Sequence, residues 1–506
     1  MTARPLRETA VHAFTVAAGA LALALAFPGT DLAGAAWVAL APVIVQALMR
    51  RPRAALGLGW LGGFLFFLFL LRWLNFTFRV YSAIPWPLVW LPTALLAGYC
   101  GLYVGLFAGA LSWIAARRSS LAAIAVAPFV WVTLEWVRGW LMGGFPWGTL
   151  GYSQYRQLPV IQIAELGGVY AVSFVVIAVN AALAAAAVVG LRRSVAGLGV
   201  AALLVTATLA FGHARLRESG TPAETASIAL IQPSIPQPLK WDPNFAASTL
   251  ANYFDLTMEA GQSRPDLVVW PETATPTVLR EDLVLQAALR QVSRQLGAGL
   301  LIGSIDAERT SPPRYRNSAV LLDERGIVNR YDKIQLVPFG EYVPLSGVIG
   351  FVRGWAEFIA DLEPGSRSVV FSGPPAPFGT VICYEGIFPA LVRRFVRDGA
   401  RFMVNMTNDG WFGRTAGPLQ HLAMYPLRAV EHRVSVVRAA NTGVSAVIAP
   451  SGAIVRSLPL YVRGTLVERV PLRRVETLYT RFGDWLPYLS LAVTVLAFGA
   501  LAWRRA

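Results

Sequence analysis

Long apolar runs constrain this chain more than any other feature of its sequence. They crowd the region before Leu216 and return once near the C-terminus. A helix that crosses the hydrocarbon core of a bilayer needs about 20 mostly apolar residues. Eight runs come close to that length: Val11–Phe27, Ala33–Leu48, Ala55–Leu74, Leu88–Ile114, Leu121–Val137, Val160–Val189, Val195–Phe211 and Trp485–Trp503. Charged residues make up only 14% of the chain, against roughly 25% in soluble domains. The sequence therefore predicts a polytopic α-helical membrane bundle of about eight spans.

The arginines give the predicted bundle an orientation, because cytoplasmic loops of membrane proteins are enriched in Lys and Arg. With eight spans, these basic clusters fall on one side: Arg4 and Arg7, Arg50, Arg51 and Arg53, Arg117 and Arg118, Arg192 and Arg193, and Arg504 and Arg505. We expect that side to be the cytoplasm of a bacterium. The opposite loops still carry Arg72, Arg79, Arg138 and Arg156, so the bias is not absolute. The first run lacks a clear signal-peptidase site, so we expect it to remain as a helix.

Two stretches of the predicted bundle are not apolar. Trp73–Arg79 continues the third run with polar and aromatic residues, and Gly143–Gly148 joins the fifth and sixth runs. Both are interpreted either as an aromatic belt at the membrane interface or as a platform that helps to hold a lipid, with Trp147 as a substrate contact. Glu135, near the end of the fifth run, is either a functional carboxylate or a side chain that reaches the interface.

From about Thr221 to Glu476 the chain reads as a soluble domain in which strand-like and helix-like segments alternate. The strand-like segments are Ala226–Gln232, Asp266–Trp270, Gly299–Gly303, Ser318–Leu322, Ile327–Tyr331, Gly379–Cys383, Phe402–Asn405, Ser435–Ala439 and Ala446–Ala449. The helix-like segments are Leu250–Gln262, Leu283–Leu296, Pro389–Asp398 and Leu419–Arg433. This alternation predicts a layered α/β domain. We therefore expect an N-terminal bundle (1–220), an α/β domain (221–476) and a C-terminal helix with a short tail (477–506).

Three polar residues that follow strand-like segments are the candidates for chemistry: Glu272, Lys333 and Cys383. We expect their strand ends to converge on one edge of a sheet, where loops form functional sites. A thiol needs a base to become a nucleophile, and Glu272 is the candidate base. Lys333 is the candidate for stabilising the oxyanion of an acyl transfer, and an ammonium near the thiol would also favour the thiolate. The alternatives are a surface ion pair for Glu272 and Lys333 and a packing thiol for Cys383.

Residue usage bears on the same site. Lysine occurs only at Lys240 and Lys333, so 42 of the 44 basic residues are arginine. This suggests that lysine is used where a compact charge with an adjustable pKa is wanted. The other cysteine, Cys100, lies inside an apolar run and is expected to be a packing residue. The four histidines are scattered, so no metal site is expected, and the net charge of +15 is ascribed largely to topological arginines rather than to nucleic-acid binding.

Five motifs make the sequence recognisable: Trp270–Glu272, Tyr331–Lys333, Pro338–Glu341, Cys383–Glu385 and Asn405–Phe412. Together they resemble the nitrilase superfamily of carbon–nitrogen hydrolases. Joined to seven spans before them and one after, they resemble the apolipoprotein N-acyltransferase family of bacterial inner membranes over essentially the whole chain. The resemblance implies an αββα sandwich domain that faces the periplasm. It also implies a Glu-Lys-Cys triad, here Glu272, Lys333 and Cys383.

The resemblance assigns further residues around the triad. A second glutamate of the family falls on Glu341, and a Tyr-Glu pair beside the nucleophile falls on Tyr384 and Glu385. A family tryptophan near the substrate opening falls on Trp241, where the match is looser. The other candidate substrate contacts are Trp147, Trp355, Asn408 and Trp411. Trp355 belongs to a glycine-rich stretch, Ser346–Trp355, that is interpreted either as a core hairpin or as a flap over a membrane-facing mouth.

By resemblance, the reaction takes an acyl chain from a membrane phospholipid, typically phosphatidylethanolamine. The chain passes through a cysteine thioester to the free α-amine of a diacylglyceryl-cysteine at the N-terminus of an apolipoprotein. No cofactor is implied, and the oligomeric state is left open, with a monomer expected. Two other classes remain. A membrane-tethered amidase or nitrilase would use water as the acceptor, although a tether needs only one span. A transporter with an outer binding domain would need interrupted, charged spans, which the sequence lacks.

Overall fold

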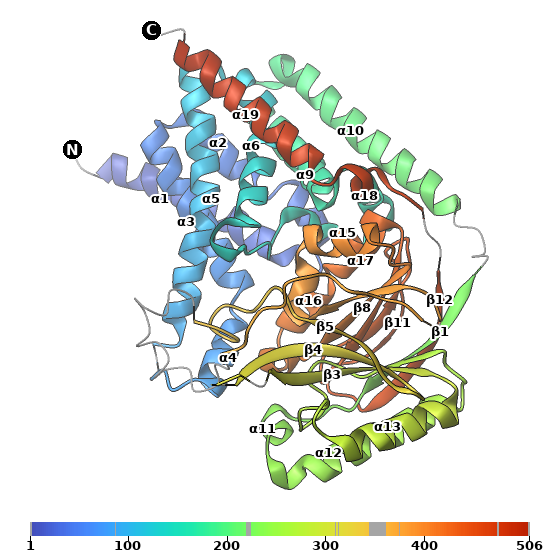
Figure 1. The fold of residues 1–506 in the computed structure, drawn as a ribbon. Helices are drawn as coiled ribbons and strands as arrows, with labels where there is room; N and C mark the ends of the chain where they lie inside the picture. Colours follow the sequence, from blue (N-terminus) through green and yellow to red (C-terminus); the bar gives the residue numbers. More distant parts are fainter. Residues whose placement is uncertain are drawn as a thin grey trace. The chain divides into compact units, whose positions relative to one another are not determined.

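The computed structural model describes residues 3–503, apart from residues 87, 219–223, 309, 312, 344–360, 374 and 473–474. The chain divides into two compact units. The helical unit comprises Met1–Asn75, Pro87–Ser219 and Phe482–Ala506, and the sandwich unit comprises Phe76–Trp86 and Gly220–Arg481. Figure 1 shows the helices of the first unit and the two sheets of the second.

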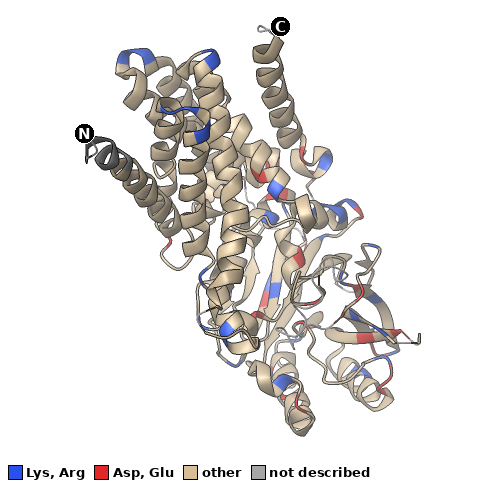
Figure 2. Cartoon of the chain, turned by 90° about the vertical axis from the view of Figure 1, so that its left-hand side faces the viewer, with Lys and Arg blue, Asp and Glu red and all other residues tan. Residues whose placement is uncertain are grey.

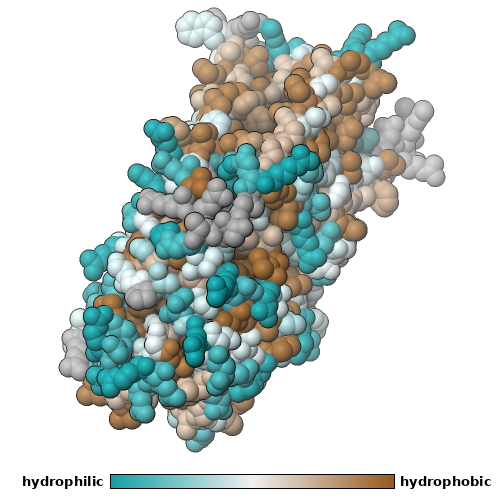
Figure 3. Space-filling model, turned by 90° about the vertical axis from the view of Figure 1, so that its right-hand side faces the viewer, coloured by the Kyte–Doolittle hydropathy of each residue, from teal (hydrophilic) through white to brown (hydrophobic). Residues whose placement is uncertain are grey.

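The helical unit contains, among the described residues, six helices that are long and apolar enough to cross a membrane. They are α3 (Pro52–Leu70), α5 (Trp90–Arg117), α6 (Ser120–Arg138), α9 (Val169–Val189), α10 (Leu191–Arg217) and α19 (Trp485–Trp503). Large apolar side chains are exposed on α10 and α19, among them Val195, Val200, Leu203, Val495 and Leu496. Figure 3 shows hydrophobic side chains gathered over this unit. An apolar surface of this extent is suited to lipid rather than to water.

The first two predicted spans differ in the structure. The first lies on α1 (Ala3–Leu25), a continuous helix of 23 residues. The second lies on the apolar stretch Ala33–Met49. That stretch is divided into the 3₁₀ helix η1 (Ala33–Trp37) and the short helix α2 (Ala41–Met49). The second predicted span is therefore not one continuous helix.

The predicted run Val160–Val189 is also divided. Gly168 has a φ of 69°, a left-handed conformation that suits glycine, and it separates two short helices from α9. These short helices are α7 (Leu158–Ile161) and α8 (Ala164–Gly167). Hydropathy alone hides such a break, because the residues on both sides of it are apolar.

Helices α3 and α5 run antiparallel with their backbones in contact. A Cβ atom on Gly63 would lie 2.8 Å from the Cα of Gly101, and one on Gly101 would lie 2.6 Å from the backbone nitrogen of Phe64. Small residues allow this close approach, which replaces the hydrophobic driving force that lipid does not provide between membrane helices. At one end of the pair, the Ser112 hydroxyl donates to the carbonyl of Arg50 at 2.5 Å.

The irregular segment between α6 and α9 is held inside the helical unit by two charged side chains of α6. The Glu135 carboxylate accepts from the backbone N–H of Leu150 at 2.7 Å. The Arg138 guanidinium donates to the carbonyls of Phe145 and Trp147 at 2.6 Å each. Non-helical backbone is tolerated at membrane depth only where its polar groups find protein partners. Glu135 is buried, so it does not reach the interface, and its contact supports a structural role.

The sandwich unit contains two six-stranded sheets. The first has the order β12-β1-β2-β3-β4-β5, formed by Gly464–Pro471, Thr225–Gln232, Leu267–Val269, Gly299–Glu308, Arg314–Asp323 and Gly326–Asp332. The second has the order β11-β10-β9-β8-β7-β6, formed by Ile454–Leu458, Ser445–Ile448, Ser435–Ala440, Phe402–Thr407, Phe378–Ile382 and Val370–Phe371. The central neighbours β1, β2 and β3, and likewise β7, β8 and β9, pair in parallel.

Helices cover the outer face of each sheet, as Figure 1 shows. In β1, Ala226, Ile228 and Leu230 belong to the core shared with the second sheet, whereas Ala229 and Ile231 belong to the core beneath helices. Those helices are α12 (Ala246–Gly261) and α13 (Leu283–Leu296), and the second sheet is covered by α15 (Pro389–Arg397) and α17 (Tyr425–His432). A strand buried on both faces explains the continuous apolar pattern of β1. The αββα sandwich implied by the resemblance is confirmed.

One segment from the N-terminal half of the chain belongs to the sandwich unit. Helix α4 (Leu74–Tyr81) begins in the helical unit and continues into the Phe76–Trp86 segment. There the Thr77 hydroxyl donates to the carbonyl of Trp411 at 2.8 Å, and the Tyr81 ring meets the Trp411 ring edge-on at 4.9 Å between centroids. Part of the polar stretch Trp73–Arg79 therefore packs on the loop that follows β8.

Candidate active site

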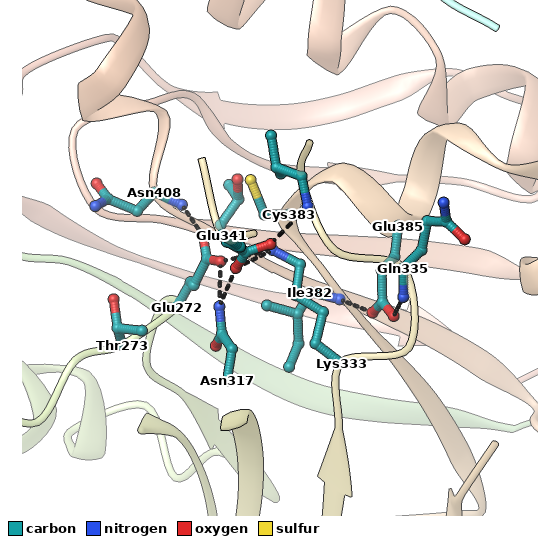
Figure 4. A network of polar contacts seen from close by, with 12 residues as sticks. Glu272, Thr273, Asn317, Lys333, Gln335, Glu341, Ile382, Cys383, Glu385 and Asn408 are labelled. Atoms are coloured by element: carbon teal, nitrogen blue, oxygen red, sulfur yellow. Dashed lines mark hydrogen bonds and ion pairs between the residues drawn. The ribbon is translucent and has the colours of Figure 1, made fainter. Parts of the chain in front are cut away.

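Each of the three predicted catalytic residues follows a strand, but the strands belong to two sheets. Glu272 lies beyond β2 and Lys333 directly follows β5, both in the first sheet, whereas Cys383 directly follows β7 in the second. The prediction that the three ends converge on one edge of a single sheet is therefore wrong. The packing of one sheet on the other brings them together, and Figure 4 shows the resulting polar network.

Both oxygens of the Glu272 carboxylate are engaged. Oε1 accepts from the Lys333 ammonium at 3.2 Å and from the side-chain amide of Asn317 at 2.7 Å. Oε2 accepts from the backbone N–H of Asn408 at 2.9 Å. Donors on both oxygens fix the orientation of the carboxylate. The geometry suits a base that is aimed before substrate arrives.

Lys333 lies between two carboxylates. Its ammonium donates to Glu341 at 2.8 Å as well as to Glu272, and Glu341 also accepts from Asn317 at 3.0 Å. The Lys333 side chain is 1% exposed, so the alternative of a surface ion pair is wrong. Burial by itself would lower the pKa of Lys333, but the charges of Glu272 and Glu341 outweigh it and raise the pKa well above its usual value. Lys333 is therefore a permanent cation at neutral pH.

Cys383 occupies a strained turn between β7 and the 3₁₀ helix η6 (Cys383–Ile387). Its φ is 51°, an uncommon conformation for a residue other than glycine. Such strain costs of order 1–3 kcal/mol and is typical of functional sites. Burial and the charge of Glu272 raise the pKa of the thiol, and the lowering effect of Lys333 does not reverse this. The ammonium of Lys333 does favour the thiolate, as expected, but desolvation outweighs this effect on the pKa.

The carbonyl oxygen of Cys383 is surrounded by donors that sequence reasoning missed. The Tyr425 hydroxyl donates to it at 3.1 Å, and the side-chain amide of Asn405 donates at 3.3 Å. The Nε2 atom of His421 lies 3.3 Å from the same oxygen. All three side chains are buried. These contacts stabilise the turn that carries the nucleophile, and only Asn405, which lies in a recognised motif, could have been suspected from the sequence.

His421 contacts a buried ion pair formed by Asp409 and Arg438. Its Nδ1 atom lies 3.1 Å from Asp409, and the other oxygen of Asp409 accepts from the Arg438 guanidinium at 2.7 Å. Burial would raise the pKa of Asp409, but the Arg438 charge outweighs it and lowers the pKa. Burial lowers the pKa of His421. The charges of this cluster balance within the protein interior, as buried charges require.

Glu385 joins the nucleophile turn to the strand end that carries Lys333. One carboxylate oxygen accepts from the Tyr331 hydroxyl at 2.7 Å and from the backbone N–H groups of Ile334 and Gln335 at 2.6 and 3.1 Å. The other accepts from the N–H of Ile382 at 2.7 Å. Burial raises the pKa of Glu385 to about 7, while these four donors favour the charged form. Glu385 is thus a positioning residue rather than a reacting group.

Replacing Glu385 with glutamine is expected to lower both stability and activity. In either orientation the amide nitrogen would face at least one backbone donor, and each unsatisfied buried group costs about 1–3 kcal/mol. Thermal unfolding in detergent should show a lower midpoint, with slower acyl transfer at temperatures where the variant is folded. The matched control is Glu324→Gln, because Glu324 lies exposed in the β4–β5 turn. Equal unfolding midpoints for the two variants would contradict the role assigned to Glu385.

The candidate substrate contacts fall in different environments. Trp241 is 50% exposed and follows the buried Lys240, as a residue at an opening would. Asn408 is buried, and its side-chain amide donates to Gln237 at 2.7 Å, so it supports Glu272 from inside the network. Trp411 packs against Tyr81 of the α4 segment. The two residues beside the nucleophile are both buried, and the Tyr384 ring packs edge-on against Phe388 at 5.1 Å.

The remaining two tryptophan candidates are Trp147 and Trp355. Trp147 is buried in the helical unit, where its ring lies 5.1 Å from that of Trp73. Burial argues against a place in an interfacial aromatic belt for Trp147. Trp355 and the rest of the proposed flap lie outside the described residues. Among the residues that the structure describes, no group of three or more His, Cys, Asp or Glu side chains could hold a metal ion.

Comparisons with known proteins agree with these features. Residues 19–182 match the family model described as the apolipoprotein N-acyltransferase N-terminal domain, and residues 227–480 match the carbon-nitrogen hydrolase model. The apolipoprotein N-acyltransferase of Geobacter metallireducens is 38% identical over 493 residues, which cover 96% of this chain and 94% of the relative. That of Azotobacter vinelandii is 35% identical over 500 residues, covering 97% and 95%. The chain belongs to the apolipoprotein N-acyltransferase family.

Membership of this family establishes an acyltransferase that N-acylates lipoproteins and is a membrane protein. Solved structures of lower similarity were also found. An amidase from Nesterenkonia sp. AN1 is 22% identical, with a TM-score of 0.39, covering 53% of this chain and 98% of the amidase. The NitFhit protein of C. elegans is 19% identical, with a TM-score of 0.41, covering 50% of this chain and 62% of that protein.

Proposed function

We propose that Cys383, Glu272 and Lys333 carry out the acyl transfer as nucleophile, general base and oxyanion stabiliser. The observation that carries this assignment is the buried network in which Lys333 is held between the carboxylates of Glu272 and Glu341, with Cys383 beside it. Two of the three N–H groups of the Lys333 ammonium bond these carboxylates. The third is assigned to the oxyanion that forms when the acyl carbonyl is attacked.

The first half-reaction loads the enzyme. Glu272 takes the proton of the Cys383 thiol as the sulfur attacks the acyl carbonyl of a phospholipid ester. The carbonyl oxygen gains negative charge and is stabilised by Lys333. The tetrahedral intermediate then collapses, the glycerol oxygen leaves, and Glu272 returns the proton to it. The products are a thioester on Cys383 and a lysophospholipid. A protonated resting thiol fits this order, because the proton then leaves only as the bond forms.

The second half-reaction unloads the enzyme onto the lipoprotein. The free α-amine of the N-terminal diacylglyceryl-cysteine attacks the thioester carbonyl, and Glu272 accepts a proton from that nitrogen. The intermediate expels the sulfur of Cys383, which recovers the proton from Glu272. An amide replaces the thioester, and the enzyme returns to its starting state. Water would be the acceptor in a tethered amidase, which is the alternative function; only the distant fold likeness to amidases speaks for it.

We assign the donor as a membrane phospholipid, with phosphatidylethanolamine as the first to test. The lipid-suited surface of α10 and α19 favours a substrate that is reached from the bilayer. The half-exposed ring of Trp241 remains the candidate contact at the opening. A monomer is sufficient for the mechanism, because all three reacting groups come from one chain.

The decisive experiment is mass spectrometry of a lipoprotein N-terminus. Purified protein in phosphatidylethanolamine vesicles is mixed with a lipopeptide that carries a diacylglyceryl-cysteine and a free α-amine. The expected result is a third acyl chain on the peptide in amide linkage, with one lysophospholipid formed per peptide. Release of free fatty acid with an unchanged peptide would favour the hydrolase. The lipid headgroup is then varied to identify the preferred donor.

We further propose that the sandwich unit faces the periplasm of a bacterium and that the helical unit lies in the inner membrane. Support comes from the arginines. Since α3 begins where the antiparallel α5 ends, the basic cluster around Arg50 and the cluster at Arg117 share one end of the helix pair. Figure 2 shows Lys and Arg residues at the upper end of the helices, drawn in blue. The chain is accordingly divided into a bundle (1–220), a catalytic domain (221–476) and a C-terminal helix with its tail (477–506).

This topology predicts the behaviour of reporter fusions. A reporter fused after Ala506 is expected to be active only if it functions in the cytoplasm. One inserted near Thr221, in a stretch outside the described residues, is expected to be active only if it functions in the periplasm. Phosphatase and green fluorescent protein fusions measure the two cases. If both sites reported the same compartment, the proposed orientation would be wrong.

A further inference from the structure

Lys240 is a buried lysine that the mechanism above does not use. It ends the short helix α11 (Gln237–Lys240) and is only 4% exposed. Apart from Lys333, it is the only lysine in the chain. An ammonium is costly to bury unless it is hydrogen-bonded and its charge is balanced. The cost of burying the Lys240 ammonium beside the catalytic network must therefore be offset by its contacts.

Two hydrogen bonds join the Lys240 side chain to the turn that carries the general base. Its Nζ atom donates to the carbonyl oxygen of Glu272 at 2.9 Å and to the hydroxyl of Thr273 at 2.6 Å. Neither acceptor is a carboxylate. The ammonium thus holds the main chain of Glu272, while the carboxylate of Glu272 stays available for its bonds to Lys333, Asn317 and Asn408.

The turn that Lys240 holds is strained. Thr273 has a φ of 47°, which is unfavourable for a β-branched residue. The neighbouring strand β3 also approaches this turn closely: a Cβ atom on Gly303 would lie 2.2 Å from the carbonyl oxygen of Pro271 and 2.8 Å from the Cα of Glu272. A conformation of this kind persists only where its surroundings hold it in place. Lys240 supplies two of those contacts.

The net charge of the site gives a second reason for a buried ammonium at position 240. Glu272 and Glu341 carry two negative charges, and Lys333 carries one positive charge. Without Lys240 the buried group would have a net charge of −1. In the transition state the negative charge moves from Glu272, which takes the thiol proton, to the carbonyl oxygen, so the sum does not change, and a net charge is expensive in a buried site. The charge of Lys240 acts on both Glu272 and Cys383, and it brings the sum to zero.

We propose that Lys240 is a positioning residue for the acyl transfer: its ammonium holds the strained Glu272–Thr273 turn and supplies the second positive charge that balances Glu272 and Glu341. This proposal rests on the proposed function of Glu272 as the base. It makes Lys240 a partner of the base rather than a group that touches the substrate. It also makes the rate sensitive to the protonation of Lys240.

The test follows the first half-reaction alone. Full-length protein in detergent is mixed with phosphatidylethanolamine that carries a fluorescent acyl chain, without any lipopeptide, and the rate of covalent labelling is measured between pH 6 and pH 10. Omitting the lipopeptide removes its titrating amine from the profile. Burial lowers the pKa of Lys240 to about 8, so labelling by the wild type is expected to slow as the pH rises through that value. The other groups that face the site are Lys333 and Cys383, whose pKa values are raised, and the carboxylates Glu272 and Glu341.

Two substitutions separate charge from geometry. Lys240→Arg keeps the positive charge at every pH used, so its labelling rate is expected to remain level where the wild-type rate falls. Lys240→Met removes the charge and both hydrogen bonds, and its rate at pH 7 is expected to fall about 100-fold, the loss typical of a misplaced catalytic group. Thr273→Val is the matched control, because it removes one hydrogen-bond acceptor of Lys240 and leaves the charge of Lys240 in place. The decline of its labelling rate at alkaline pH should match that of the wild type.

The outcomes distinguish this proposal from the proposed function. If the wild type forms no Cys383 thioester, the proposed function fails. If the wild type is labelled but Lys240→Arg retains the same alkaline decline, or folded Lys240→Met is labelled within threefold of the wild-type rate, Lys240 has no such role and the proposed function stands. Thermal unfolding midpoints report whether each variant is folded, and the Lys240→Arg profile remains decisive if Lys240→Met is not.

Discussion

Replacing Cys383 with alanine is expected to abolish acyl labelling of the protein by a phospholipid and to abolish lipoprotein N-acylation. The thiol is the only group among the proposed triad that can form a thioester, so no slower route through Glu272 or Lys333 replaces it. Wild-type protein mixed with a phospholipid that carries a labelled acyl chain should accumulate the label when no acceptor is present. Neutral hydroxylamine should remove the label, because it cleaves thioesters readily and leaves amides intact.

Cys100 provides the matched control for this experiment. It is a free thiol, fully buried in α5 of the helical unit, and lies far from Cys383 in the sequence. Cys100→Ala should be labelled at the wild-type rate, and the label should pass to a diacylglyceryl peptide when that is added. Labelling of folded Cys383→Ala at the wild-type level would contradict the mechanism, whatever the family membership implies.

Replacing Lys333 with arginine is expected to reduce turnover by about 100-fold or more, even though the charge is conserved. Removing a donor that is aimed at an oxyanion lowers kcat by a factor of about 10²–10³. The planar guanidinium is larger than an ammonium and cannot keep one N–H group on each carboxylate while a third points at the substrate. Lys333 is only 1% exposed and has carboxylates at 3.2 and 2.8 Å, so the site has no room for a different geometry.

The reverse exchange on the same strand serves as the control. Arg330 lies in β5 three residues before Lys333 and pairs with Asp332 at 3.0 Å and with Asp306. Arg330→Lys keeps the positive charge beside Asp306 and Asp332, neither of which is assigned a role in the reaction, and should leave turnover within twofold of the wild type. Turnover and membrane accumulation are measured for both variants. Near-normal turnover of Lys333→Arg would contradict the oxyanion role and leave Lys333 with ion pairs alone.

Elements with strong local signals were predicted well. The helix expected over Leu283–Leu296 forms over the same residues, because Asp282 caps its start and Gly297, in a left-handed conformation, ends it. The strand expected over Ala226–Gln232 differs from β1 by one residue. In contrast, β11 and β12 were missed. Their side chains are largely exposed or half-buried, so neither has the apolar run by which a buried strand is found.

The neighbours of the triad were harder to predict than the triad itself. Asn317 lies in the middle of β4, with nothing in its local sequence to suggest contacts with Glu272 and Glu341. His421 and Tyr425 lie on a helical stretch with no motif of their own, yet both approach the carbonyl of Cys383. These contacts join residues that are distant in sequence, and a pattern within one segment carries no information about them.

The sequence by itself determined the class of protein, the membrane-bound half, the strand–helix alternation of the sandwich and the identity of the three candidate catalytic residues. The class of protein follows from the resemblance of its motifs to a known family, and the rest follows from hydropathy, periodicity and residue type, which are local properties. Only the tertiary structure decided that Glu272 and Lys333 meet Cys383 across two sheets and that Glu135 supports an irregular segment. It also decided that the pKa of the Cys383 thiol is raised, because desolvation depends on everything packed around the sulfur and outweighs the nearby ammonium.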